Sequence, residues 1–171
     1  MAVRSPERMF GFVVHEVARL LRRRFEQRLR STGIGLTRAQ CAVLVNLVER
    51  EGINQACLAQ VLDIEPITLV RLLDRLQDAG LIVRKPDPKD RRAYGLELTD
   101  RAKPVLEQIY ALAQKVYEEA QAGLSKDAVS HLLSNLHLIK ANLSAATAEA
   151  LPSSQVKAPT RVIRSRSKHR A

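Results

Sequence analysis

Apolar residues recur at helical spacing from the first residues of the chain. A helix start is favoured by Ser5-Pro6-Glu7, which combine a serine N-cap, a proline at the first helical position and an acid near the positive dipole end. Gly33 and Gly35 end the pattern. Its apolar stripe consists of Phe10, Val14, Val17, Leu21, Phe25 and Leu29. The stripe runs too far to be covered by local neighbours alone, so we expect a partner chain to cover part of it.

Three shorter helices are predicted next. Thr37 to Gln40 form a capping box at the start of the first, and Asn54 starts a second, short helix. A third runs from Pro66 at its first helical position to Ala79, with Gly80 as its stop. Its inward positions are leucines: Leu69, Leu72, Leu73 and Leu76. Two short helices joined by a tight turn are typical of a helix-turn-helix.

The period then changes from helical to alternating. Strands are expected at 81–85 and 95–98, around a polar, Pro-rich connection over 86–92. Thr99 is expected to cap a helix from Asp100 to about Ala122, and Ser125 to cap the last one. Beyond Ala150 the chain lacks apolar periodicity, which predicts a disordered tail. The fold class is therefore mainly α with a small β-wing, a winged helix-turn-helix.

Composition and charge refine this picture. Aromatic residues are only 4% and Trp is absent, so the core must consist largely of Leu, Val, Ile and Ala. The net charge is +10, but six of the 28 Lys and Arg lie in 152–171, where there is no acid. The rest of the chain is only mildly basic, at +4. A case for nucleic-acid binding must therefore rest on where its cations lie.

The candidate chemistry lies on the 66–79 helix and the hairpin. With its leucines inward, this helix has Thr68, Arg71 and Arg75 on the open side, where arginine can contact a guanine edge in the major groove. The hairpin tip adds cations suited to phosphate or a narrow minor groove: Lys89, Arg91 and Arg92. The alternatives are a solvated helix face for the two helical arginines and, for Arg92, a structural pair with Asp90.

These motifs resemble the MarR family of regulators, especially its SlyA-like branch. The matching stretches are LTRAQ at 36–40, GINQACLAQVL at 52–62, IEPITLVRLLDRLQDAGLI at 64–82, PDPKDRRA at 86–93 and LTDRAKPVL at 98–106. The resemblance covers 5–148. It implies a two-fold dimer whose first and last helices interlock, with Arg71 reading the groove from a helix that starts at Pro66, and with Arg91 and Arg92 on the wing. At Cys41 many relatives have an aromatic residue.

The resemblance divides the chain into four parts. They are an N-terminal dimerisation helix (5–34), a DNA-binding lobe (35–100), C-terminal dimerisation helices (101–148) and a disordered basic tail (149–171). Within the lobe, the recognition helix spans 66–79 and the wing 81–98. Such a homodimer is expected to read an inverted-repeat operator on double-stranded DNA, with half-sites about one helical turn apart, roughly 34–36 Å.

The family typically responds to a small molecule, often an aromatic carboxylate or phenolic acid. Five residues lie where the resemblance implies a crevice, namely His15, Arg19, Arg22, Arg38 and Cys41. An arginine there can pair with a carboxylate, and the basic first helix would also suit an acyl-CoA thioester. The alternative is that His15 is structural and the arginines are solvated. We predict a repressor that an anionic ligand releases.

Other classes fit less well. A thiol-based redox sensor would use Cys41 or Cys57, but both are expected to be small buried residues without a neighbouring basic cluster. A nonspecific architectural DNA-binding protein would use the basic tail. The chain lacks the motifs of an enzyme, and no cofactor or metal ion is expected. The first residues are charged where a signal peptide is apolar, and no apolar run is long enough for a membrane span, so we expect a soluble, cytoplasmic protein.

Overall fold

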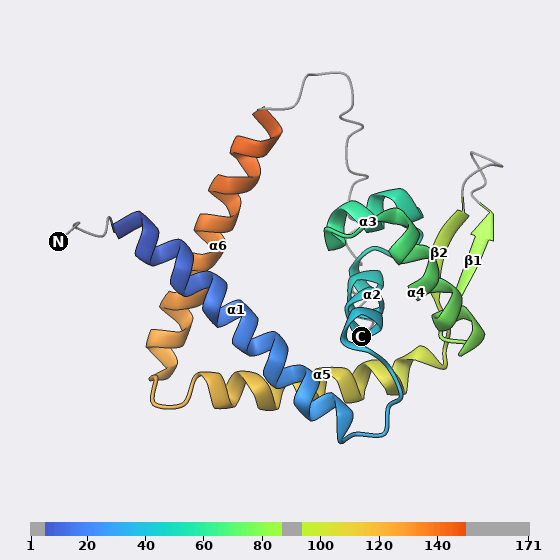
Figure 1. The fold of residues 1–171 in the computed structure, drawn as a ribbon, viewed down its shortest axis with the longest axis horizontal. Helices are drawn as coiled ribbons and strands as arrows, with labels where there is room; N and C mark the ends of the chain where they lie inside the picture. The colour runs from blue at the N-terminus through green and yellow to red at the C-terminus, as the bar shows by residue number, and fades with distance from the viewer. Residues whose placement is uncertain (1–5, 87–93, 150–171) are drawn as a thin grey trace, which may run out of the picture. The chain divides into compact units, whose positions relative to one another are not determined.

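The computed structural model describes residues 6–86 and 94–149 and confirms the predicted fold class. The chain forms two compact units, 1–122 and 123–171. The first contains five helices and a two-stranded sheet among its described residues, and the second contains one helix (Figure 1). In chain order the elements are α1 (Pro6–Arg30), α2 (Arg38–Glu49), α3 (Gln55–Leu62), α4 (Pro66–Asp78), β1 (Ile82–Pro86), β2 (Tyr94–Leu98), α5 (Ala102–Ala120) and α6 (Lys126–Glu149).

The core of the first unit is aliphatic, as the composition requires. Leucines from α2, α3, α4 and β2 are completely buried there, and α5 closes the core with Ala102, Leu106 and Ile109. Burying one leucine side chain stabilises a fold by roughly 1.5–3 kcal/mol. The fully buried leucines are Leu44, Leu47, Leu58, Leu73, Leu76 and Leu96. This core fixes which side of α4 points inward.

Most of the predicted helix boundaries are confirmed by their hydrogen bonds. Thr37 and Gln40 form the capping box of α2, and the Asn54 side chain accepts a hydrogen bond from the Cys57 backbone at the start of α3. Pro66 is the first residue of α4, and Gly80 follows the helix with a φ of +68°. That angle lies in the left-handed region, which glycine adopts without steric cost.

Thr99 does not cap the following helix, contrary to the sequence prediction. Its hydroxyl donates a hydrogen bond to the Gly80 carbonyl at 2.7 Å, and α5 begins only at Ala102, without a side-chain cap. The end of α4 leaves a carbonyl without a helical partner. Because the Thr99 hydroxyl bonds to this carbonyl, it does not cap the N-terminus of α5.

The wing is an antiparallel pair with a third segment at its root. Strands β1 and β2 pair in register from Ile82 with Leu98 to Pro86 with Tyr94. The Gly52 backbone donates to the Leu96 carbonyl at 2.8 Å, and the Leu96 backbone donates back to Ile53 at 3.0 Å. A Cβ on Gly95 would lie only 3.1 Å from the Gly52 carbonyl oxygen. Glycine at position 95 therefore allows the loop before α3 to pack directly on β2.

Helix α1 packs on α5 through its C-terminal half. Leu29 is buried and Phe25 is half-buried, and the acid Glu119 on α5 forms ion pairs with Arg24 (2.7 Å) and Arg28. The N-terminal half of α1 keeps its large apolar side chains exposed. They are Phe10, Phe12, Val13, Val14, Val17 and Leu20. Within the described residues of the first unit, the predicted stripe is thus covered at one end only.

The second unit consists, in its described part, of α6. Ser125 caps this helix as predicted, since its hydroxyl accepts a hydrogen bond from the Ala128 backbone at 3.2 Å. Several leucines on α6 are exposed: Leu132, Leu133, Leu136, Leu138 and Leu143. Among the described helices of the whole chain, none has the length and apolar character needed to span a membrane.

Candidate nucleic-acid interface

Helices α3 and α4 form the predicted helix-turn-helix. The turn between them runs through Asp63, whose φ of +51° is left-handed, and Glu65 is the N-cap of α4. On α4, Leu69 and Leu73 are at most 1% exposed. The side chains predicted to face outward are exposed in the structure: Pro66, Thr68, Arg71 and Arg75. The inward leucines and outward arginines are therefore placed as the sequence pattern predicts.

The guanidinium groups of Arg71 and Arg75 have no ion-pair partner among the described residues. The nearest acid in sequence on the same helix, Asp74, is paired instead with Arg84 of β1, at 2.6 Å. Arg84 also donates to the Gln77 side chain at 2.8 Å. Because Asp74 is held by Arg84, the forked donors of Arg71 stay available for an external acceptor such as a guanine edge or a phosphate.

Sequence reasoning missed the role of Arg84. Side chains alternate between the two faces of a strand, so Arg84 shares a face with Ile82, which is buried in the core. That alternation is the signal that points Arg84 toward α4 rather than toward solvent. The sequence pattern did not reveal that two polar side chains on α4 would meet it.

Lys89, Arg91 and Arg92, with the possible pair between Asp90 and Arg92, lie outside the described residues. Their contribution to the interface remains a prediction from the sequence.

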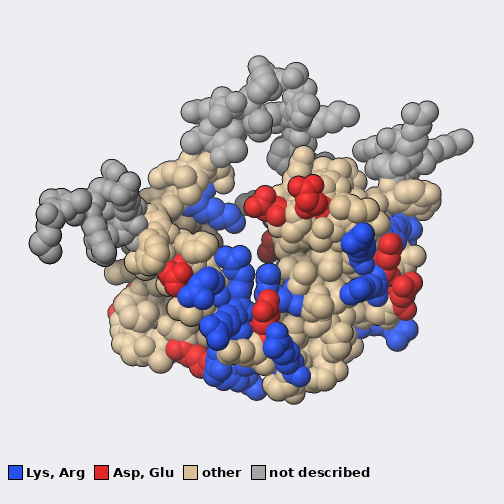
Figure 2. All heavy atoms as spheres, in the orientation of Figure 1, with Lys and Arg blue, Asp and Glu red and all other residues tan. Residues whose placement is uncertain are grey.

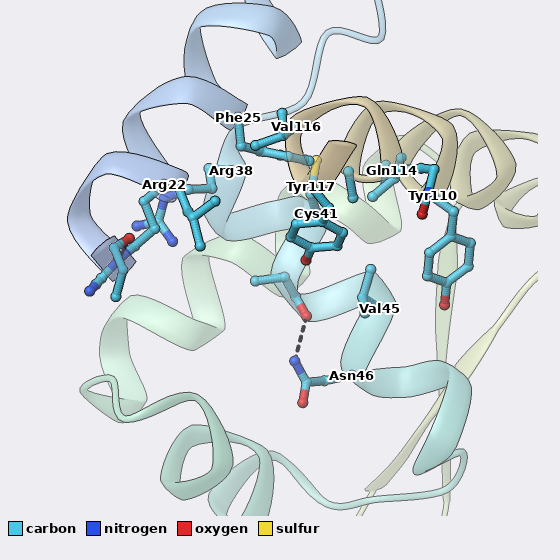
Figure 3. Close-up of a pocket in the computed structure, with 15 residues that line it drawn as sticks. Arg22, Phe25, Arg38, Cys41, Val45, Asn46, Tyr110, Gln114, Val116 and Tyr117 are labelled. Atoms are coloured by element: carbon cyan, nitrogen blue, oxygen red, sulfur yellow. Dashed lines mark hydrogen bonds between the residues drawn. The ribbon is translucent and has the colours of Figure 1, made fainter. Parts of the chain in front are cut away.

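A cavity of about 720 Å³ lies between α1, α2 and α5 (Figure 3). This volume is in the range of small-molecule pockets, roughly 300–1,000 Å³. Most of its wall is apolar, with Phe25, Val45 and Val116 among the lining residues. The tyrosines Tyr110 and Tyr117 of α5 also line it. Such a cavity suits a ligand with an aromatic or apolar body.

Arginines lie at one end of this cavity. Figure 3 shows Arg22 and Arg38 together on one side, and Tyr110 with Gln114 on the other. Arg38 donates to Glu26 at 2.8 Å, whereas Arg22 donates from Nε to the Ala18 carbonyl and has no ion pair among the described residues. The terminal nitrogens of Arg22 are therefore available to an anion.

The five residues predicted to contact a ligand separate into two groups. Arg22, Arg38 and Cys41 line the cavity. His15 and Arg19 are exposed and are not among its described lining residues; Arg19 pairs with Glu16 on its own helix at 2.6 Å. Hydrogen bonding to Arg19 lowers the pKa of the Glu16 carboxyl.

The two cysteines differ, and the expectation that both are buried is wrong for one of them. Cys41 is 2% exposed at the cavity wall, and burial raises its pKa to about 11. Cys57 is exposed near the start of α3, because this position of the short helix faces away from Leu58 and the core. Both thiols are free.

Basic side chains are unevenly distributed on the first unit. Figure 2 shows Lys and Arg gathered over the middle and C-terminal part of α1, with a second group over α4 and the wing strands. On α1, Arg19 pairs with Glu16, and Arg24 and Arg28 pair with Glu119, so the positive charge of this helix is partly neutralised by acids. The α4 group includes Arg71 and Arg75, which have no acidic partner among the described residues.

A helix-turn-helix with free arginines on its second helix, followed by a two-stranded wing, defines a winged-helix DNA-binding protein. Comparison with known proteins points to one family. The MarR family model matches residues 34–93, which include α2, α3, α4 and β1. Over these residues the chain is similar to MarR-family transcriptional regulators, a family of regulators rather than of enzymes.

Solved structures of the family match beyond the lobe. Wild-type MarR from E. coli, in its apo form, is 29% identical with a TM-score of 0.68, over 75% of this chain and 94% of that one. A MarR-family regulator from Rhodococcus is 25% identical with a TM-score of 0.69, over 80% and 96% of the two chains. A mutant of E. coli MarR complexed with operator DNA is 29% identical with a TM-score of 0.64, over 75% and 91%.

Proposed function

We propose that this protein is a homodimeric repressor that binds an inverted-repeat operator and is released from it by a small anionic ligand. Each protomer would insert α4 into a major groove, with Pro66, Thr68, Arg71 and Arg75 at the interface. The wing would add Lys89, Arg91 and Arg92. The observation that carries this proposal is the outward face of α4, where arginines without acidic partners lie opposite completely buried leucines. The operator complex of the E. coli relative supports it.

The first test is the replacement of Arg71 by Ala. A bidentate arginine–guanine contact contributes about 1–3 kcal/mol of discrimination, so the variant should lose at least about fivefold in operator affinity. The measurement is fluorescence anisotropy at moderate salt, on a duplex selected from a random pool by the full chain. Arg23→Ala is a matched control, because Arg23 is an exposed arginine on α1. Equal affinity of the two variants would contradict the proposal.

The dimer is supported by apolar surface that the described chain leaves exposed. Helix α1 carries exposed Phe10 and Val17, and α6 carries exposed leucines. Exposed apolar patches larger than a few hundred Å² are rare on monomers and mark interaction sites. A symmetric dimer would place its two α4 helices about 34–36 Å apart, to match successive major grooves. The motifs quoted above favour the SlyA-like branch, and we propose that the regulator acts in the cytoplasm.

The ligand proposal rests on the cavity between α1, α2 and α5. Its apolar wall with two tyrosines suits an aromatic ring, and Arg22 offers donors for a carboxylate. We propose an aromatic carboxylate or phenolic acid, or its CoA thioester, as the effector. The ligand can release DNA only if it binds more tightly to a lobe spacing that does not fit the operator.

Calorimetric titration with salicylate, coumarate and coumaroyl-CoA tests the ligand proposal. Binding of one of them should weaken at least about tenfold in Arg22→Ala, because a charge-assisted hydrogen bond contributes about 1.5–3 kcal/mol. His15→Ala should bind normally, because His15 is not among the described lining residues. No heat from any of the three compounds would contradict this part of the proposal and leave the DNA-binding part standing.

Two alternatives have less support. A redox sensor would need a reactive thiolate, and burial raises the pKa of Cys41 to about 11, so this cysteine is protonated at neutral pH. An architectural DNA-binding protein would draw its affinity from the cationic tail and show little sequence preference. The helix-turn-helix with its free arginines favours a sequence-specific regulator.

A further inference from the structure

One apolar side chain on α4 has no role in the core. Ile67 is 63% exposed, and it is the only large hydrophobic residue that is exposed among those of α4. Isolated exposed apolar residues are common on protein surfaces, so its exposure alone has no functional meaning. Its position in the helix is more informative.

Ile67 lies on the same face as the arginine proposed to read the groove. Residues four apart in a helix are neighbours on one face, so Ile67 lies beside Arg71. Residues two apart are about 200° apart around the axis, so Ile67 points away from Leu69, which is 1% exposed. Thr68 follows Ile67 in the same first turn and is also exposed. Ile67 therefore belongs to the surface that the proposed function places against DNA.

Helix stability does not explain an isoleucine at this position. Its branched side chain gives it a lower helix propensity than Ala or Leu, and here it gains no burial in return. Pro66, which precedes it, already sets the start of the helix. An alanine or a charged residue would serve a purely solvated position at least as well.

The major groove contains one apolar group that an exposed isoleucine can cover. This is the C5-methyl of thymine, which is absent from the other three bases. Side chains four residues apart are about 6 Å apart along the helix, or roughly two base-pair steps of 3.4 Å. A methyl covered by Ile67 would therefore lie within about two base pairs of the guanine read by Arg71.

We infer that Ile67 is a specificity-determining residue that recognises a thymine in each half-site by packing against its C5-methyl group. This inference rests on the proposed function, because it requires α4 to enter the major groove. It adds to that function a preference for thymine that depends on the methyl group rather than on a hydrogen bond.

The test removes the methyl group and the side chain separately. The full chain is first used to select duplexes from a random pool, and each thymine of the selected sequence is then replaced in turn by deoxyuridine. Deoxyuridine keeps every hydrogen-bonding group of thymine and lacks only the methyl. At one symmetric pair of positions, wild-type affinity should fall about threefold to tenfold. In Ile67→Ala the same replacement should have no effect, and Ile67→Val should keep part of it.

Two controls make the result specific. Val48→Ala removes an equally apolar, exposed side chain from α2 and should keep the full response to deoxyuridine. Circular dichroism should show both alanine variants folded, because neither position is buried. If Ile67→Ala responds to deoxyuridine as the wild type does, or if no position responds in the wild type, the inference is wrong and the proposed function stands. If no duplex is selected at all, the proposed function fails, and the inference fails with it.

Discussion

Arginines of this protein have different roles because their neighbours differ. Arg84 lies between Asp74 and Gln77 and has its charge compensated within the lobe. Arg71, one turn away from Asp74 on the same helix, has no acid partner in the described chain. A sequence pattern assigns both residues the same positive charge. The contacts of the folded chain determine which of them can bind an external anion.

The two cysteines provide a residue-scale prediction. Cys41 is buried with a pKa raised to about 11, so at pH 8 it is protonated and unreactive, while Cys57 is exposed. Titration of the native protein with a chromogenic disulfide reagent at pH 8 should therefore modify one thiol per chain rapidly. Cys57→Ser should abolish this rapid phase and Cys41→Ser should leave it unchanged. Rapid modification of Cys41 would show that the cavity wall opens and would restore the redox alternative.

At the scale of elements, most starts and stops were predictable because they depend on neighbouring residues only. The capping box at Thr37, the cap at Asn54 and the proline at position 66 each act within one helical turn. Thr99 shows where such reasoning ends. Its hydroxyl could have accepted a hydrogen bond from the backbone of the following helix. Instead it donates to the Gly80 carbonyl just after α4, 19 residues earlier in the sequence. That choice depends on how α4 packs against the wing, which no local pattern encodes.

The contact between Arg84 and α4 leads to a prediction for DNA binding. Arg84→Ala would free Asp74, which lies three residues from Arg71 on the same helix and can pair with it. We expect the variant to lose about fivefold to fiftyfold in operator affinity, although Arg84 itself is not proposed to touch DNA. Anisotropy on the selected duplex measures this loss.

A second substitution separates this effect from simple loss of folding. Asp74→Asn in the Arg84→Ala background removes the freed charge and should recover most of the affinity. Lys85→Ala is the matched control, since Lys85 is the neighbouring cation on β1 and pairs with Glu97 of β2 instead. If the double variant binds as weakly as Arg84→Ala, release of Asp74 is not the cause.

At the scale of the whole molecule, the sequence indicated an apolar surface on α1 that a single chain does not cover. The stripe on α1 was predicted to exceed the reach of its own chain, and its N-terminal half is exposed in the structure. The cavity was less predictable. Arg38 and Cys41 lie 16 and 19 residues after Arg22, and they meet it only because α1 and α2 both pack against α5. His15 and Arg19 belong to the same helix, and no local signal places them outside the cavity.

The exposed stripe leads to a prediction about assembly. Val17 on α1 and Val48 on α2 are nearly equally exposed, at 49% and 46%. If α1 is part of the dimer interface, Val17→Asp buries an unpaired charge there and should shift sedimentation from dimer to monomer at micromolar concentration. Val48→Asp should remain dimeric. A dimer of undiminished stability in Val17→Asp would exclude this part of α1 from the interface.

The cationic tail leads to a prediction about salt dependence. Residues 152–171 contribute six positive charges and no negative ones. If they act only by nonspecific attraction to phosphate, deleting them should reduce the slope of affinity against salt and lower affinity for all sequences alike. The ratio of specific to nonspecific affinity should stay within about twofold of the full chain's ratio. Loss of that ratio would favour the architectural alternative.

The close approach of Gly95 to Gly52 has a mechanical consequence. Backbone hydrogen bonds join the loop before α3 to β2, and Arg84 joins β1 to α4. Both helices of the helix-turn-helix are therefore attached to the wing. A ligand held against α2 can then hardly bend the wing by itself. It would have to rotate the whole DNA-binding lobe as a rigid body. A small displacement at the cavity would then produce a larger displacement of α4 in the DNA groove.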